Sequence, residues 1–182
     1  MFAKTIENKK QLMAALLTRE TFDFFETVSG SVTTFAEFSV DGQYHERFYQ
    51  DDPEADAPSR EAGAPGREAG VLSREAGTPG REYAPWSLLR PFFLSVIRGK
   101  NTPLSFQFVF RLPAEEMNAL IAEEAIAAEA VTDVSGLLLN LSFDGTSILL
   151  TTGVSHKTFS MDRTLERAWD RYVEQRFSDY FD

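Results

Sequence analysis

The sequence lacks several features that would place a protein in a functional class at once. It has no cysteine, which excludes a disulfide framework, a cysteine-ligated zinc site and a thiol nucleophile. No apolar run approaches the ~20 residues of a membrane-spanning helix. The apolar run near the start, residues 12–17, is too short for the core of a signal peptide. We therefore expect a soluble protein of the reducing cytoplasm with no membrane partner.

Basic residues are also scarce. The chain has 28 acidic and 18 basic side chains and a net charge of −10. Residues 51–82 contribute −4 of this charge and the rest of the chain −6, so the acidity is not local. Nucleic-acid binders usually have a basic excess, because neutralisation of phosphates supplies most of their affinity. Nucleic acid is therefore a disfavoured partner.

A seven-residue repeat is the most conspicuous feature that is present. Its four arginines are each followed by glutamate: Arg60, Arg67, Arg74 and Arg81. A coiled coil would need apolar seam positions, and Pro65 and Pro79 would break its helices. The glycines do not follow the three-residue period of collagen. The composition predicts a disordered low-complexity loop insertion over residues 51–82, with a docking segment as the alternative.

The rest of the chain has the composition of one folded domain. Without residues 51–82 it retains 150 residues, a length at which a single core buries about 68–70% of the unfolded chain's surface. Sixteen phenylalanines supply a large apolar content. We expect a single α+β domain over residues 1–182, interrupted by the repeat.

Helical periodicity occurs in four segments: residues 7–17, residues 85–99, the segment opened by Pro113 and the segment from about Thr164. Proline suits the first position of a helix, which favours a start at Pro113. Pro91 lies inside the second segment and predicts a kink or a start there.

Strand patterns alternate with these helices. Residues 104–112 alternate between apolar and polar side chains. Asp-Gly pairs at residues 41–42 and 144–145 predict hairpin turns. The expected strands are residues 21–28 and 31–40, which meet at residues 29–31, then residues 43–49 and the two strands within 136–152. The predicted class is α+β, with four helices packed on a largely antiparallel sheet of hairpins.

Two segments, "RGKNTPLSF" and "TTGVSHKTF", are the most specific parts of a wider resemblance. Over residues 1–50 and 83–176 the chain resembles a family of small bacterial proteins known only as a domain of unknown function. This resemblance implies a soluble intracellular protein. It implies no activity, because no activity is established for that family.

The same two segments hold the best candidate ligand site. Their hydroxyl, imidazole and cationic side chains would suit a small anion such as phosphate if the segments met in space. The residues are Arg98, Lys100, Thr152, Ser155, His156 and Lys157. The simpler interpretation is a strand turn with exposed polar residues beside an ordinary basic helix end, where cations are favoured by the helix dipole.

No catalytic or cofactor-binding motif is present. No metal site is expected either, because the two histidines, His45 and His156, lie in different predicted hairpins and cysteine is absent. The predicted register places Glu37 opposite Glu46, a pair that could share a proton or a cation, although a shifted register is the commoner explanation.

The sequence therefore favours a non-catalytic cytoplasmic binding or interaction module, with no cofactor and with an unknown protein or a small anion as partner. The alternative is an enzyme or sensor for a small phosphorylated ligand that uses the Arg98/Lys100 and His156/Lys157 loops.

Overall fold

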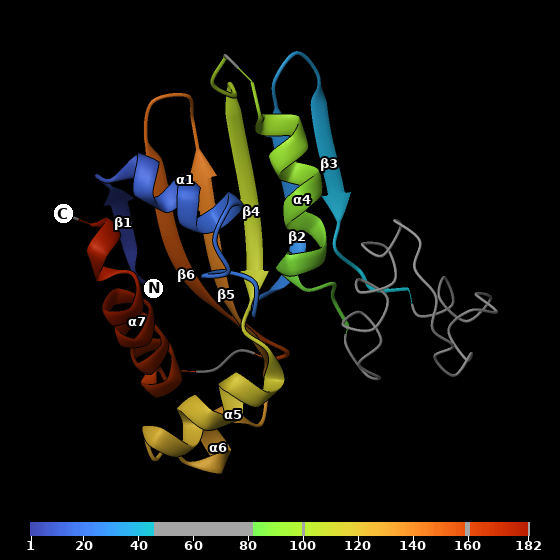
Figure 1. The fold of residues 1–182 in the computed structure, drawn as a ribbon. Helices are drawn as coiled ribbons and strands as arrows, with labels where there is room; N and C mark the ends of the chain where they lie inside the picture. Colours follow the sequence, from blue (N-terminus) through green and yellow to red (C-terminus); the bar gives the residue numbers. More distant parts are fainter. Residues whose placement is uncertain (46–81, 100, 159–160, 182) are drawn as a thin grey trace, which may run out of the picture.

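The protein is built on one antiparallel sheet. The computed structural model describes residues 1–45, 82–99, 101–158 and 161–181. The sheet has six strands in the order β1-β6-β5-β4-β2-β3 (Figure 1). They are β1 (Ala3–Ile6), β2 (Glu26–Thr33), β3 (Glu37–Asp41), β4 (Ser105–Arg111), β5 (Val134–Phe143) and β6 (Ile148–His156). The predicted α+β class is confirmed. The repeat predicted at 51–82 lies outside the described residues, apart from Glu82.

Three helices cover one face of the sheet (Figure 1). They are α1 (Lys9–Leu17), α4 (Trp86–Ile97) and α7 (Thr164–Arg176), and the short 3-10 helix η1 (Ser178–Tyr180) follows α7. Two further helices, α5 (Ala114–Glu123) and α6 (Ala128–Val131), lie beyond one end of the strands (Figure 1). All four predicted helices are present. Pro91 lies inside α4 and does not end it.

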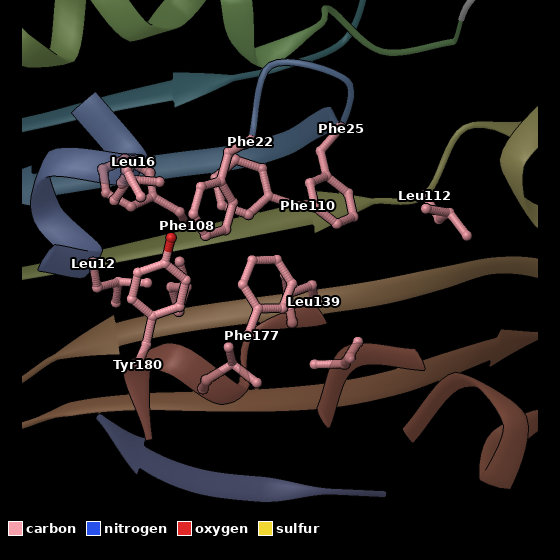
Figure 2. Close-up of a cluster of buried hydrophobic side chains, with 14 of the residues drawn as sticks. Leu12, Leu16, Phe22, Phe25, Phe108, Phe110, Leu112, Leu139, Phe177 and Tyr180 are labelled. Carbon is pink, nitrogen blue, oxygen red and sulfur yellow. The ribbon is translucent and has the colours of Figure 1, made fainter. Parts of the chain in front are cut away.

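The covered face is almost entirely aromatic and aliphatic. Side chains from β4, β5, α1 and the chain end converge on one cluster, which includes Phe22, Phe108, Phe110 and Phe177 (Figure 2). The rings of Phe22 and Phe177 stack with centroids 5.1 Å apart. Buried indoles also find partners: the Nε1–H of Trp86 donates to the carbonyl of Leu16 at 2.7 Å. A core of this kind fixes the positions of α1, α4 and α7 on the sheet.

The opposite face of the sheet carries no helix among the described residues; we call it the open face (Figure 1). Alternation along the strands places one side chain in two on it. Its first cross-strand row is Thr5, Leu149, Ser142, Gln107, Ser31 and Ser39. Its second row is Ala3, Thr151, Asn140, Val109, Ser29 and Asp41. These side chains are exposed or half-buried.

The second predicted hairpin is confirmed, with its turn at residues 144–147. Phe143 pairs with Ile148, and Gly145 adopts a φ of +92°, which favours glycine. The Asp144 carboxylate accepts hydrogen bonds from the backbone N–H groups of Thr146 and Ser147 at 2.8 and 2.7 Å. These bonds lower the pKa of Asp144 from its usual 3.8, the bond from Ser147 being the largest cause.

Two turn predictions for this region are wrong: residues 29–31 form no turn, and residues 41–42 extend the pairing with β2 instead of turning a hairpin. β2 runs without interruption through residues 29–31, and the chain turns at residues 34–36. The glycine at 30 is needed for packing instead, because a Cβ there would lie 2.7 Å from Cζ of Phe93. Gly42 continues beside β2 and donates to the carbonyl of Val28 at 3.0 Å. Glu37 consequently lies opposite Thr33, and Glu46 is outside the described residues.

The two ends of the chain close the sheet edge beside β6. β1, which the sequence did not predict, pairs with β6 from Ala3 to Ile6. The last aromatic side chains pack on the body of the protein. Phe177, Tyr180 and Phe181 are buried, and the Phe181 ring lies 5.7 Å from that of Phe2.

Candidate functional site

The structure does not bring the two predicted basic segments together. Thr102, within the first segment, shares a hollow with Ile148 at the start of β6. His156 is the last residue of the same strand. At about 3.3 Å per residue, these two ends of β6 are separated by roughly 26 Å. One small ligand therefore cannot contact both Arg98 and His156. Lys100 lies outside the described residues.

Thr152, one of the predicted ligand residues, has a structural role. Its side chain is buried, and its hydroxyl oxygen accepts a hydrogen bond from the backbone N–H of Phe2 at 2.8 Å. The same hydroxyl donates to the carboxylate of Asp170 on α7. Thr152 thus fastens the start of the chain and α7 to β6. Ser155 is half-buried near the end of β6, opposite Gly136.

His156 and Lys157 line an open cleft of about 570 Å³ between the end of β6 and the start of α7, which we call the His156 cleft. Both side chains are exposed, and neither has a hydrogen bond or ion pair with another described residue. The backbone beneath them is fixed, because the N–H of Lys157 donates to the carbonyl of Asp133 at 2.7 Å. Arg163 adds a third basic side chain to the wall.

The carboxylates of the His156 cleft are already engaged. Glu166 accepts a hydrogen bond from the α-ammonium of Met1, and this bond is the main reason that the pKa of the ammonium is raised from 8.0. Asp162 accepts hydrogen bonds from the hydroxyl and backbone N–H of Thr164 at 2.6 and 2.8 Å. The pKa of Asp162 is consequently lowered from 3.8, with the hydroxyl as the first cause. The side chains of His156 and Lys157 therefore face solvent.

At the opposite end of the sheet, two hollows share Thr102 in their walls; together we call them the Thr102 groove. The larger hollow, of about 390 Å³, lies between the end of α4 and the β2–β3 turn, and Arg98 lines it. The smaller, of about 210 Å³, is walled by Met13, Pro103, Phe106, Phe143 and Ile148. Lys9 and Lys10 of α1 also line the smaller hollow.

Exposed apolar side chains surround the larger hollow. Phe35, in the β2–β3 turn, is 93% exposed, and Leu104, just before β4, is 66% exposed. Sequence reasoning missed this arrangement. It assigned Leu104 to the buried face of a strand, and it singled out neither Phe35 nor the lysines of α1. Only the polar half of "RGKNTPLSF" gave a usable signal.

Comparison with known proteins places the chain in a family. Residues 15–63 and 70–180 match the family described as "Family of unknown function (DUF5721)", and the protein belongs to it. This confirms the resemblance seen in the sequence. No curated protein and no solved structure matches the chain. Family membership therefore supplies no ligand and no reaction.

Two absences among the described residues are relevant to the kind of site. No group of three or more histidine, cysteine, aspartate or glutamate side chains among them is arranged to hold a metal ion. Over the same residues, no helix is both long enough and apolar enough to span a bilayer.

Proposed function

We propose that the protein is a non-catalytic cytoplasmic binding module whose ligand site is the Thr102 groove. The ligand is a segment of a partner protein that carries apolar side chains next to acidic ones. The observation that carries this proposal is the pair of adjoining hollows bordered by the exposed side chains of Phe35 and Leu104.

The size of the smaller hollow suits a side chain better than a free metabolite. Ligand pockets for drug-sized molecules enclose about 300–1,000 Å³ and bury most of the ligand. The smaller hollow, at about 210 Å³, is below that range. A buried anchor side chain in each of two neighbouring pockets is a typical arrangement of a protein interface.

The charge of the groove supports an acidic ligand. Every charged residue in the described lining is basic: Arg98 in the larger hollow, Lys9 and Lys10 in the smaller one. This occurs in a chain whose net charge is −10. Screening at physiological salt limits charge effects to about 8 Å, so the local cations outweigh the distant acids for a bound segment.

The lining also favours binding over acid–base chemistry. Over the residues described, it holds no carboxylate and no imidazole, the groups most often used to move protons near neutral pH. The absence of cysteine is the feature that supports a cytoplasmic location.

The test uses 1-anilinonaphthalene-8-sulfonate, an apolar anion, and peptides selected from a random display library on the purified full chain. We expect the dye fluorescence to saturate as the dye binds. Leu104→Glu should lower the affinity for the dye at least about tenfold, because this change places a negative charge beside the anionic dye. Lys10→Glu should act in the same direction. Selected peptides should be acidic, carry apolar anchors and displace the dye.

Met161→Glu is the matched control, since Met161 is 87% exposed and lies in sequence between Thr158 and Asp162, two residues of the His156 cleft. It makes the same kind of change without touching the described groove lining. Equal loss in Leu104→Glu and Met161→Glu would contradict a localised site. Selected peptides without acidic residues would contradict the assigned ligand chemistry.

A second candidate function rests on the His156 cleft of about 570 Å³, where the exposed side chains of His156 and Lys157 have no hydrogen-bond or ion-pair partner among the described residues. There we propose recognition of a small anion such as phosphate. Titration with inorganic phosphate should shift the NMR signals of the His156 ring saturably, and Lys157→Ala should weaken this response severalfold. Lys10→Ala, which removes a cation at the other end of the molecule, should not change it. A linear response in all three proteins would reject the site.

A further inference from the structure

We infer that the open face is a self-association surface, through which two copies of this chain pack sheet against sheet. The inference is independent of the Thr102 groove, which lies at one end of the strands. It begins from an unusual property of the face, which is its lack of charge.

Both central rows of the open face are uncharged except for one residue, and the row beside them holds Arg111, which pairs with Glu82, and Glu26, which is buried. The first, from Thr5 to Ser39, holds no ionisable side chain, and the second, from Ala3 to Asp41, holds one at its edge. Charged residues make up 25% of the whole chain. A face that serves only to meet water is usually charged, whereas depletion of charge marks the centre of interfaces. The polar side chains here are hydroxyls and amides, which can bond across an interface without an ionic partner.

A second copy fits this face better than a different partner does. The two central rows give an acidic or basic partner little charge to pair with. An identical copy presents the same hydroxyl and amide groups, each able to donate and accept. Such an interface uses the same patch twice and closes on itself.

The area of the face agrees with a dimer of modest affinity. Six strands about 4.8 Å apart and roughly seven residues long cover about 550 Å² in projection. Standard specific interfaces bury about 800 Å² on each partner, and transient ones bury less. We therefore expect a dimer that dissociates in the micromolar range.

Charge also selects the orientation of the pair. The acids of the open face, Glu37 and Asp41, lie on the edge strand β3. A twofold axis parallel to the strands places β3 of one copy over β1 of the other, where Ala3 and Thr5 are uncharged. An axis across the strands would place the acids of both copies together, which is costly. Aligned packing of two sheets at about 30° is compatible with the first arrangement.

Sedimentation equilibrium of the full chain tests the inference. We expect a mass of twice 20.5 kDa at high concentration and a dimer that tightens with added salt, because salt screens the repulsion between copies of charge −10. Gln107→Glu, isosteric and exposed at the centre of the first row, should weaken the dimer by at least roughly tenfold. Gln175→Glu, exposed on α7, adds the same charge away from the open face and should have no effect.

A second measurement does not depend on charge. The chain has no cysteine, so Gln107→Cys introduces a single thiol next to the middle of the sheet. Mild oxidation should link two copies of this variant, and Gln175→Cys should remain unlinked under the same conditions. A wild type that stays monomeric at all concentrations overturns the inference. So does a dimer that Gln107→Glu leaves intact or that Gln175→Cys captures equally well.

Discussion

The two faces of the sheet are made by the same strands and have opposite chemistry. On β4, Phe106, Phe108 and Phe110 point into the helix-covered core, while Ser105, Gln107 and Val109 point the other way. β5 repeats the pattern, with Leu139 and Leu141 on one side and Asn140 and Ser142 on the other. The covered face is held by burial of apolar area, whereas the open face contributes little to folding unless something covers it. Substitutions on the covered face should therefore change the free energy of unfolding, whereas substitutions on the open face should change the association of two copies.

The largest difference between the faces should appear at two successive residues of β4. Phe108→Ala should lower the free energy of unfolding by about 3–5 kcal/mol, because a fully buried ring packed against Trp86 and Phe93 is removed. Gln107→Ala should change it by no more than about 0.5 kcal/mol in the monomer. Urea denaturation of both variants at low protein concentration is the measurement. Similar losses in the two would mean that the open face is also part of a core.

The same contrast should hold on β5 with aliphatic side chains. Leu141→Ala should cost about 2–5 kcal/mol, since the side chain is fully buried between its neighbours Phe108 and Leu150. Ser142→Ala is its control on the open face, with an expected change below about 0.5 kcal/mol. A loss below about 1 kcal/mol for Leu141→Ala would reverse the assignment of the faces.

Replacing a glycine by alanine compares the two faces in another way, because it adds one Cβ atom to each. Gly30→Ala should destabilise by about 1–3 kcal/mol, because its Cβ would lie 2.7 Å from the buried ring of Phe93. Gly153→Ala on the open face would meet only Cβ of Leu138, at an ordinary 3.8 Å. It should raise thermal stability slightly, by roughly 0.4–1 kcal/mol, through a less flexible unfolded chain. Destabilisation by both changes would show that strand geometry and not packing accounts for the glycine at position 30.

The smallest effect concerns the loss of stability in acid that arises at the turn between β5 and β6. This turn joins the two strands at one end of the sheet. Hydrogen bonds from Ser147 and Thr146 lower the folded-state pKa of Asp144 below 3.8. The stability that this shift provides is complete above pH 3.8 and is lost as the pH falls through the lower, folded-state pKa. Asp144→Asn should therefore have a flatter loss of stability below pH 4 than the wild type. Parallel curves would show that these bonds do not depend on the charge.

The sequence predicts the helices and the α+β class well, because their signals are local. Apolar spacing, Pro113 and the pair at 144–145 each act within a few residues. The first hairpin was misread because the glycine at 30 is required by Phe93, a residue 63 positions later in the chain. β1 carries no strand pattern of its own and is defined only by its pairing with β6.

The candidate site was predictable only in part, for a similar reason. Arg98 and the pair at 156–157 line hollows, as expected of ligand residues, but strand direction places them at opposite ends of β6. The polar character of "TTGVSHKTF" did not reveal that the hydroxyl of Thr152 is hydrogen-bonded to Phe2 and Asp170 within the protein. The Thr102 groove combines α1, α4, β4 and a turn, and no single stretch of sequence contains its pattern.

The short ladder between residues 42–44 and 82–84 has a consequence for how the chain can vary. The N–H of Tyr44 donates to the carbonyl of Glu82 at 2.9 Å, the N–H of Ala84 donates to that of Gly42 at 2.8 Å, and Gln43 bridges Tyr83. The ladder therefore holds residues 44 and 82, at the two ends of the intervening stretch of sequence, side by side. Each doubling of such a segment adds only about 0.6 kcal/mol of closure entropy. A gain or loss of seven-residue units there therefore changes the closure entropy only slightly. This position can accommodate insertions of different lengths.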